Sequence, residues 1–288
     1  MTLPHHPDAA TPLASARSFL FVPGNRPERF EKAIRSGADA VVLDLEDAVP
    51  TGDKRLARDA VALALPKLAG LGVPLVVRIN TVDSSSGLDD LRALRELAGL
   101  AGLDGVMVPK AESASALGVV REWLPRTPIL ALIESAAGHA ALGGIAASAN
   151  VLRLVIGHID FMADTGLQCG PDQAELAPLR FAVAMATRAH RLAPAVDGVT
   201  PEVDDAERLR QDTLRCVRFG FGAKLCIHPR QVPGVHEAFA PSADEVAWAR
   251  RVVEADAAAG GAAVQLDGRM VDTPVVLQAR RLIARQRC

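Results

Sequence analysis

The sequence predicts an α/β protein built as a closed (β/α)8 TIM barrel with a C-terminal helical extension. Eight short apolar runs alternate with helix-like stretches, a pattern typical of parallel α/β architecture. The length of 288 residues accommodates one barrel of roughly 250 residues with additional terminal segments. Charged residues close several of the apolar runs, as expected where the carboxyl ends of barrel strands meet at one rim.

The eight apolar runs are expected to be buried parallel strands. They lie at residues 18–23, 40–46, 74–79, 105–109, 129–134, 153–159, 194–199 and 223–228. A doubly wound open sheet is the alternative, but such a sheet usually carries a glycine-rich dinucleotide-binding turn after its first strand. The corresponding turn here, VPGNRPERF, contains one glycine, which favours the closed barrel.

Helical patterns fill most of the intervals between these strands. We expect helices at residues 27–36, 54–68, 88–97, 114–124, 137–149, 176–191 and 204–219. The barrel is predicted over residues 17–240, after a flexible N-terminal tail at 1–16. The extension at 241–288 is predicted to contain a helix at 244–259, a turn at Asp267-Gly268 and a last helix at 274–285. A lid and an oligomer contact are both open as roles for this extension.

The composition excludes several classes of protein. A hydrophobic content of 49% is globular, and a net charge of -2 without a basic block argues against nucleic acid as a partner. No apolar run reaches the about 20 residues of a membrane span, and the first sixteen residues lack the features of a signal peptide. The four cysteines form no C-x-x-C pair, which favours reduced thiols and a cytoplasmic location.

Charged side chains at the ends of successive predicted strands are the most informative feature of the chain. A charge at the end of a buried strand is unfavourable unless it is paired or binds a ligand. Because all strand ends of a parallel barrel meet at one rim, these residues predict an active site there. They are Asp44, Glu46, Arg78, Lys110, Glu134 and Asp160.

Glu134 and Asp160 are candidate metal ligands because they close the neighbouring fifth and sixth predicted strands. Two carboxylates can hold one hard divalent cation, and Mg²⁺ typically takes one or two of them and leaves other positions to water and substrate. Since no His/Cys cluster has zinc spacing, Mg²⁺ or Mn²⁺ is the better interpretation. The alternative is that each carboxylate only pairs with an arginine or caps a helix.

Arg78 and Lys110 are the candidate cationic groups at this rim. The planar fork of Arg78 suits a substrate carboxylate or carbonyl oxygen, and a salt bridge to Asp44 or Glu46 is an alternative compatible with that role. A strand-end lysine could form a Schiff base with a ketone. The acidic surroundings of Lys110 favour the protonated amine, so a structural or phosphate-contacting role is preferred.

Several stretches of the chain together match one known family in the same order. They are RSFLFVPGNRPERFEKA, GADAVVLDLEDAV followed by Lys54 and Arg58, VVRIN, GVMVPKAES, LIES, GHIDF, GFGAKLCIHPRQV and GRMVDTPV. Over residues 17–286 the chain thereby resembles the citrate lyase β-subunit-like group of the HpcH/HpaI aldolase superfamily.

This resemblance implies roles for particular residues. It implies that Glu134 and Asp160 hold Mg²⁺, and that Arg78 binds the carboxylate or carbonyl of an oxo- or hydroxyacid. It places the loop from Pro23 to Asn25 near the coenzyme A carrier. A catalytic base is expected in DGVTPEVDD, where Asp197 and Asp205 fit the family pattern, and the alternative for Asp205 is a plain helix-start residue. Glu202 stands where an aspartate is common, so this stretch departs from the pattern.

The resemblance also implies the activity. The expected function is a Mg²⁺-dependent carbon–carbon lyase that cleaves or forms citryl-, malyl- or citramalyl-CoA, with acetyl-CoA and an oxoacid as the other partners. A homotrimer or hexamer is expected. The alternatives are a β subunit working with the α and γ subunits of citrate lyase on a carrier-bound thioester, a metal-dependent 2-oxoacid aldolase, and a non-catalytic binding barrel. One sequence does not select the thioester or the direction of the reaction.

Overall fold

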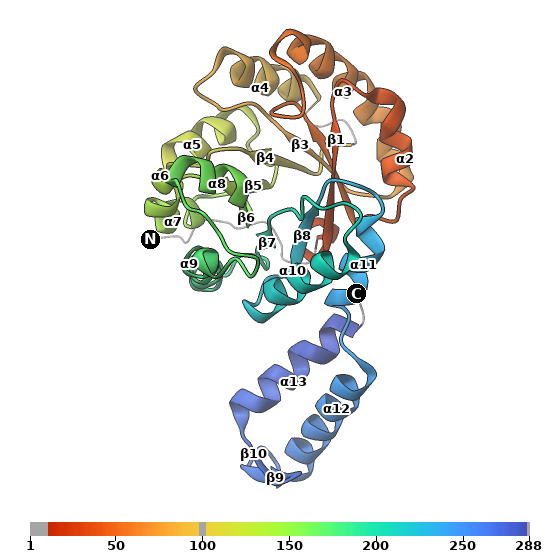
Figure 1. Ribbon diagram of the computed structural model, residues 1–288, viewed down its shortest axis with the longest axis vertical. Helices are drawn as coiled ribbons and strands as arrows, with labels where there is room; N and C mark the ends of the chain where they lie inside the picture. The colour runs from red at the N-terminus through yellow and green to blue at the C-terminus, as the bar shows by residue number, and fades with distance from the viewer. Residues whose placement is uncertain (1–10, 98–101, 287–288) are drawn as a thin grey trace. The chain divides into compact units, whose positions relative to one another are not determined.

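A computed structural model describes residues 11–97 and 102–286, and the chain divides into two compact units after Val235. In the first unit eight parallel strands form a closed barrel in the order β1 to β8. Helices follow the strands around the outside of this barrel (Figure 1). The prediction of a (β/α)8 TIM barrel is confirmed.

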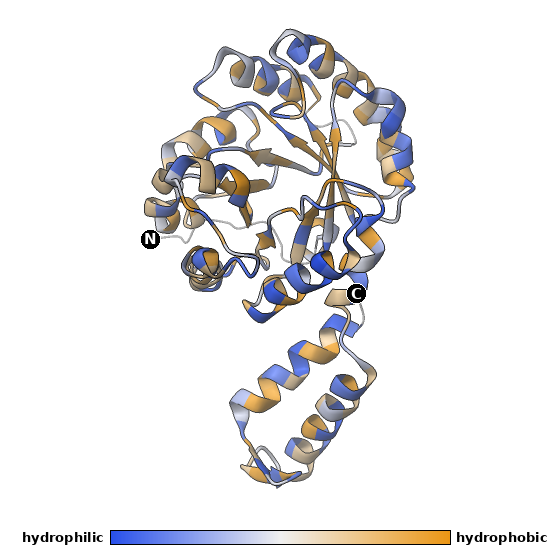
Figure 2. Ribbon diagram, in the orientation of Figure 1, coloured by the Kyte–Doolittle hydropathy of each residue, from blue (hydrophilic) through white to orange (hydrophobic). Residues whose placement is uncertain are grey.

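The strands are short and almost completely buried. Figure 2 shows them as predominantly apolar ribbons at the centre of the unit. Continuous apolar runs are expected where helices cover the outside of a parallel sheet and side chains fill its inside. The strands are β1 Ser18–Pro23, β2 Ala40–Asp44, β3 Leu75–Arg78, β4 Gly105–Val108, β5 Ile129–Ile133, β6 Val151–Ile156, β7 Val196–Asp197 and β8 Ala223–Cys226.

Most helices begin where the sequence places a capping or helix-forming residue. Ser113 and Ser135 cap two of them by accepting a backbone N–H with their hydroxyl groups. The helices are α1 Pro12–Ser15, α2 Phe30–Ile34, α3 Lys54–Leu68, α4 Ser85–Leu97, α5 Ala114–Trp123, α6 Ala136–Ala140, α7 Leu142–Ala146, α8 His158–Thr165, α9 Ala177–Ala189, α10 Ala206–Arg218 and α11 Gln231–Phe239.

The amino-terminal end of the barrel is closed by a segment that the sequence assigned to a flexible tail. Residues 1–10 of that predicted tail lie outside the described residues. Helix α1 carries Leu13 into the barrel core, where it packs with Phe19 and Met107. Arg153, fully buried on β6, donates to the backbone oxygens of Leu13 and Ala16 at 3.2 and 2.6 Å. Residues 12–16 of the predicted tail therefore include a short helix with buried contacts.

Three further elements differ from the sequence-based prediction. The expected helix over 137–149 is two short helices, because the chain turns at Ala141 between α6 and α7. The expected strand over 194–199 is reduced to β7, with two residues. The expected strand over 153–159 ends at Ile156, and α8 begins two residues later. This last difference moves Asp160 from a strand to the first turn of a helix.

The second unit, described by itself, is a helical hairpin with a small ribbon. Helix α12 Ala243–Ala258 begins with a capping box between Ser242 and Glu245, and α13 Thr273–Gln286 is the last helix. Between them, β9 Val264–Leu266 and β10 Arg269–Val271 pair antiparallel. The turn connecting them contains Asp267 and Gly268, both at positive φ, as the Asp-Gly signal predicts.

None of the helices within residues 11–97 and 102–286 is both long enough and apolar enough to cross a membrane.

Candidate active site

A cavity of about 180 Å³ opens at the carboxyl ends of the barrel strands. It brings together four of the residues predicted from the sequence, contributed by β2, β3 and the segments after β5 and β6. In a TIM barrel this rim is the place of catalysis. The lining residues are Phe21, Asp44, Ala48, Arg78, Leu132, Glu134, Ile156, Gly157, His158, Ile159, Asp160, Val199, Leu225 and Ile227.

Arg78 is fixed by a bidentate ion pair with Asp44. The two residues are direct partners in the register of β2 and β3. Nε and Nη2 of Arg78 each lie 2.6 Å from a carboxylate oxygen of Asp44, which is fully buried. The guanidinium carbon also lies 4.8 Å from the centre of the Phe21 ring. Such a paired and stacked arginine has one orientation, so its remaining N–H groups have fixed directions.

Glu46 provides a second carboxylate for Arg78. Its Oε2 lies 2.8 Å from Nη1 of Arg78, and its Oε1 lies 3.6 Å from Nζ of Lys110. Burial raises the pKa of Glu46 to about 7, although the charge of Arg78 acts in the opposite direction. The positive charges of Arg78 and Lys110 stabilise the ionised carboxylate of Glu46 in this buried position.

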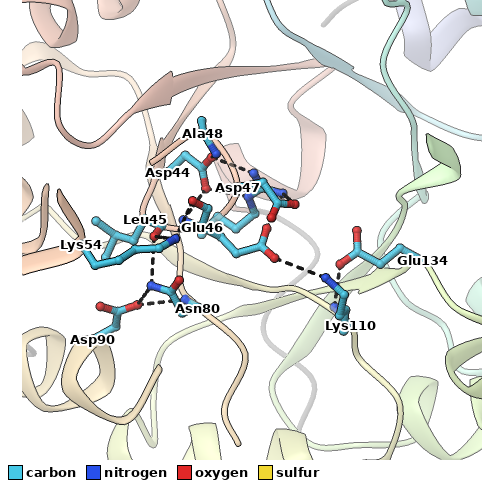
Figure 3. Close-up of polar contacts among 11 residues, drawn as sticks. Asp44, Leu45, Glu46, Asp47, Ala48, Lys54, Asn80, Asp90, Lys110 and Glu134 are labelled. Atoms are coloured by element: carbon cyan, nitrogen blue, oxygen red, sulfur yellow. Dashed lines mark hydrogen bonds and ion pairs between the residues drawn. The ribbon is translucent and has the colours of Figure 1, made fainter. Parts of the chain in front are cut away.

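A buried network under the rim holds the loop that carries Glu46. Lys54 donates from Nζ to the backbone oxygens of Leu45 and Glu46 at 2.8 and 2.7 Å. Asn80 donates to the same Leu45 oxygen at 2.9 Å and to Asp90 at 2.6 Å. Figure 3 shows Lys54 and Asn80 reaching the backbone of this loop, with Asp90 hydrogen-bonded to Asn80. They satisfy backbone groups that burial would otherwise leave unpaired.

Lys110 lies between Glu46 and Glu134 (Figure 3). Its backbone is in the left-handed region with φ of 44°, a conformation that non-glycine residues adopt rarely and mostly for a structural reason. Its backbone N–H donates to Oε1 of Glu134 at 2.7 Å. Burial opposes the charge of Lys110, but the carboxylates of Glu46 and Glu134 raise its pKa above the usual value. The protonated amine predicted from the sequence fits this environment.

Glu134 is 2% exposed and lines the cavity. Burial raises its pKa to about 8, and the N–H of Lys110 acts in the opposite direction. Gly157 lies beside it, because a Cβ at that position would be 2.4 Å from Oε2 and 2.7 Å from the Cβ of Glu134. The absence of a side chain at position 157 therefore leaves the space that this carboxyl occupies.

Asp160 contributes the second acid from helix α8. It occupies the third position of that helix, where a negative charge interacts favourably with the helix dipole. The described residues contain no cluster of three His, Cys, Asp or Glu side chains suited to a metal ion. A pair of carboxylates on one cavity fits a cation that takes its other ligands from water or substrate.

His158 is 2% exposed and also lines the cavity. It is the first residue of α8. Burial lowers the pKa of the imidazole to about 4.

Besides Glu46 and Lys110, three further predicted residues lie outside the cavity lining. Pro23 ends β1 and is the register partner of Asp44. Asn25 donates to Asp53 at 3.0 Å. Asp205 is exposed and caps α10, where its carboxylate accepts the N–H of Arg208 at 2.9 Å. Within one chain this acid is a helix cap, because it does not reach the cavity.

Sequence reasoning did not assign a role to several residues that shape the site. Lys54 belongs to the stretches that match the family but received no function from them, and Asn80 received none although it follows Arg78 by two residues. Phe21 and Gly157 had no individual signal. The sequence pattern that could have pointed to Gly157 is a glycine shortly before a predicted acidic ligand, where backbone and side chain approach closely.

Comparison with known proteins decides the family. The sequence profile of HpcH/HpaI aldolase/citrate lyase matches residues 17–229. The chain belongs to the HpcH/HpaI aldolase/citrate lyase family. This confirms the family and the lyase class predicted from the sequence.

Relatives within the HpcH/HpaI family cover nearly the whole chain. A citrate lyase subunit beta-like protein of Deinococcus radiodurans is 37% identical, over 96% of this chain and 99% of its own. A (3S)-malyl-CoA thioesterase of Cereibacter sphaeroides is 34% identical, over 93% and 94%. The structure of CitE from Mycobacterium tuberculosis in complex with magnesium, acetoacetate and coenzyme A is 34% identical, with a TM-score of 0.83 over 96% of this chain and all of that one.

Proposed function

We propose that the protein is a Mg²⁺-dependent lyase that cleaves a 3-hydroxyacyl-CoA into acetyl-CoA and an oxoacid. Malyl-, citramalyl- and citryl-CoA are the candidate substrates. The observation that carries the proposal is the convergence of Arg78, Glu134 and Asp160 on one cavity at the catalytic rim of the barrel. The CitE relative with magnesium, acetoacetate and coenzyme A supports the same ligand classes.

The acid pair fits a hard divalent cation. Glu134 keeps Oε1 engaged with the N–H of Lys110, while Asp160 approaches from the first turn of α8. Both acids supply only oxygen ligands, which suits Mg²⁺ and also Mn²⁺. When bound, the cation would polarise an oxygen atom of the substrate as a Lewis acid.

Arg78 would bind the oxoacid portion of the substrate. Its hydrogen bonds to Asp44 use two of the five N–H groups of a guanidinium, and Nη1 forms an ion pair with Glu46, so N–H groups remain for a carboxylate or carbonyl oxygen. Because Asp44 and Phe21 fix the guanidinium, it is oriented before the substrate arrives. Such a preorganised charge stabilises negative charge that develops on the carbonyl oxygen in the transition state.

The reaction breaks the bond between the α-carbon of the thioester and the carbon that bears the hydroxyl group. The electron pair of that bond goes to the α-carbon and forms the thioester enolate, while the hydroxyl oxygen becomes the carbonyl of the oxoacid. The hydroxyl proton is removed by a base, and a proton is delivered to the α-carbon to give acetyl-CoA. Lys110, protonated and exposed at the rim, adds a positive charge near the anionic groups.

Two alternatives concern the thioester. The malyl-CoA thioesterase relatives support hydrolysis of the thioester bond as a second candidate function. The citrate lyase subunit alternative requires a thioester on a carrier protein and the α and γ subunits.

We propose a homotrimer or hexamer as the assembly, which light scattering after gel filtration would measure.

The test is incubation of the purified protein with Mg²⁺ and each of malyl-, citramalyl- and citryl-CoA. Formation of acetyl-CoA and the matching oxoacid, abolished by EDTA and by Glu134→Gln, is the expected result. Free malate with coenzyme A would instead identify a thioesterase. Absence of both product sets in the presence of bound Mg²⁺ would contradict a standalone CoA lyase, and release of pyruvate from a hydroxy-oxoacid would identify an aldolase.

A further inference from the structure

Lys54 is a cation at a position where helix geometry disfavours one. It is the first residue of α3, and a positive charge at the amino-terminal end of a helix interacts unfavourably with the helix dipole. Its Nζ lies 2.8 and 2.7 Å from the backbone oxygens of Leu45 and Glu46, in the loop after β2 (Figure 3). The contacts of the amine, and not the helix, therefore explain a lysine at this position.

The amine of Lys54 bridges two successive carbonyl groups. Both oxygens carry partial negative charge, so bringing them within 3 Å of one point is favourable only around a cation. Hydrogen bonds from a charged donor are also stronger than neutral ones. The Leu45 oxygen has a further donor in Asn80 at 2.9 Å, and the Glu46 oxygen has one in the N–H of Val49 at 2.9 Å. Asn80 and Val49 each reach one of the two oxygens, whereas Lys54 joins them.

The segment held by Lys54 carries one of the two acids that bind Arg78. The Leu45 N–H donates to the backbone oxygen of Arg78 at 2.9 Å, and Glu46, the next residue, places Oε2 at 2.8 Å from Nη1 of the same arginine. Asp44 is fixed independently, because it belongs to β2 and its carboxylate accepts the N–H groups of Glu46 and Ala48. A shift of the loop would consequently displace the Glu46 carboxylate more than that of Asp44.

Helix α3 ties this loop to the segment after β3. Arg58 lies four residues after Lys54, so both cations are on one face of the helix. Nε of Arg58 lies 2.7 Å from Asp90, which is fully buried and also accepts the backbone N–H of Asn80 at 2.9 Å. One helix face therefore holds both the loop with Glu46 and the residue that follows Arg78 by two positions.

We propose that Lys54 is a positioning residue that acts through Glu46 on Arg78. By joining the backbone oxygens of Leu45 and Glu46 it holds the Glu46 carboxylate on Nη1 of Arg78, and the guanidinium is thereby oriented for the oxoacid. The inference rests on the proposed function, which makes the oxoacid the ligand of Arg78. Lys54 itself touches no substrate, and its effect arises because misplacement of a binding group by about 1 Å is enough to impair function.

The test is calorimetric binding of pyruvate, glyoxylate and oxaloacetate at saturating Mg²⁺, followed by comparison of variants with the tightest of the three. Lys54→Met has a similar length but neither charge nor donors, and should weaken oxoacid binding by about 10-fold or more. Lys54→Arg keeps a cation with several donors and should lose less than about threefold. Lys67→Met is the matched control, because Lys67 is an exposed lysine in the last turn of the same helix. It should leave the affinity unchanged.

A double-mutant cycle with Glu46→Ala separates positioning from a general effect on the fold. In the Glu46→Ala background Lys54→Met should weaken oxoacid binding by less than about twofold, because the carboxylate that Lys54 holds is absent. A residue that only stabilises the fold would cause the same loss in both backgrounds. Mg²⁺ affinity without oxoacid should stay within about threefold of the wild type in Lys54→Met, since the acid pair is carried by the segments after β5 and β6.

Equal losses in the two Glu46 backgrounds would overturn the inference, as would unchanged oxoacid affinity in Lys54→Met or a loss of Mg²⁺ affinity as large as the loss of oxoacid affinity. If Lys54→Met does not fold, Lys54→Ala replaces it and the same cycle decides. Failure of the wild type to bind any of the three oxoacids with Mg²⁺ present would contradict the proposed function and the inference with it, whereas the other outcomes leave the proposed function intact.

Discussion

Gly157 and Glu134 approach so closely that a Cβ on Gly157 would lie 2.4 Å from Oε2 and 2.7 Å from the Cβ of the glutamate. The carboxyl end of Glu134 could rotate away from such an atom, but its Cβ is fixed by the backbone after β5. The glycine thus sets the position of the most buried acid of the cavity after Asp44. Catalytic sites depend on such supporting groups, because displacement by about 1 Å is enough to impair function.

Replacement of Gly157 tests this relationship directly. Gly157→Ala should displace Glu134 and weaken Mg²⁺ binding by about 10- to 100-fold, the range observed when groups supporting a metal ligand are removed. Calorimetric titration with Mg²⁺ provides the measurement. Gly144→Ala in α7 is the control, because no atom lies within 4 Å of the position that a Cβ would take there. Equal affinities in both variants and the wild type would contradict the proposed role of Gly157.

The ion pair between Arg78 and Asp44 should be required for both stability and turnover. Removal of one member of a buried pair leaves the other charge uncompensated, so Asp44→Ala should reduce the free energy of unfolding by about 3–5 kcal/mol. Arg78→Lys keeps the positive charge but loses the planar guanidinium group with its paired N–H donors. It should lower kcat/KM by at least about 100-fold and reduce the free energy of unfolding less than Asp44→Ala does. Urea unfolding and steady-state kinetics measure the two effects. Full activity of Arg78→Lys would remove the guanidinium from substrate binding.

Glu46 should make the free protein more stable at lower pH. Its carboxyl binds a proton more tightly in the folded protein, where burial raises the pKa to about 7, than in the unfolded chain, where the reference value is 4.5. The folded state is therefore favoured by this group below the unfolded pKa, and that contribution is lost as the pH rises towards 7. Glu46→Gln should flatten the dependence of the melting temperature on pH between about 5 and 8 in EDTA. Parallel curves for wild type and variant would disprove the assignment.

Asp205→Asn separates helix capping from acid–base chemistry. Asparagine caps helices about as well as aspartate does, so the melting temperature should stay close to that of the wild type. Because Asp205 lies outside the cavity lining, turnover should also be retained. A loss of turnover without a change in melting would restore Asp205 as the catalytic base suggested by its sequence context.

Arg153 should act only on stability. It is fully buried at the end of the barrel opposite the cavity and donates to backbone oxygens of Leu13, Ala16 and Pro194. Arg153→Leu leaves these oxygens without donors and should reduce the free energy of unfolding by about 3 kcal/mol or more. Mg²⁺ affinity should not change. Arg92→Ala, which breaks an exposed ion pair with Asp89, should change stability by less than about 0.5 kcal/mol.

The barrel and the charged residues at its rim were predictable because both follow from local patterns. Alternating apolar runs and helical stretches give the order of the strands, and a parallel barrel necessarily places the residues closing those runs at one end. Asp44, Arg78 and Glu134 therefore reached the cavity as expected. Asp160 reached it as well, although from a helix rather than from a strand. Periodicity alone does not distinguish a strand end from the first turn of a following helix.

The sequence by itself determined the fold class, the family and the acidic and basic groups of the rim, since these depend on residue type and spacing along the chain. Only the tertiary structure decided which groups pair with which. It assigned Asp44 to Arg78, Lys54 and Asn80 to one carbonyl oxygen, and no partner among the described residues to His158. Hydrogen bonds and steric exclusion act over a few ångströms between segments far apart in sequence. For that reason the close fit of Gly157 to Glu134 exists only in the folded chain.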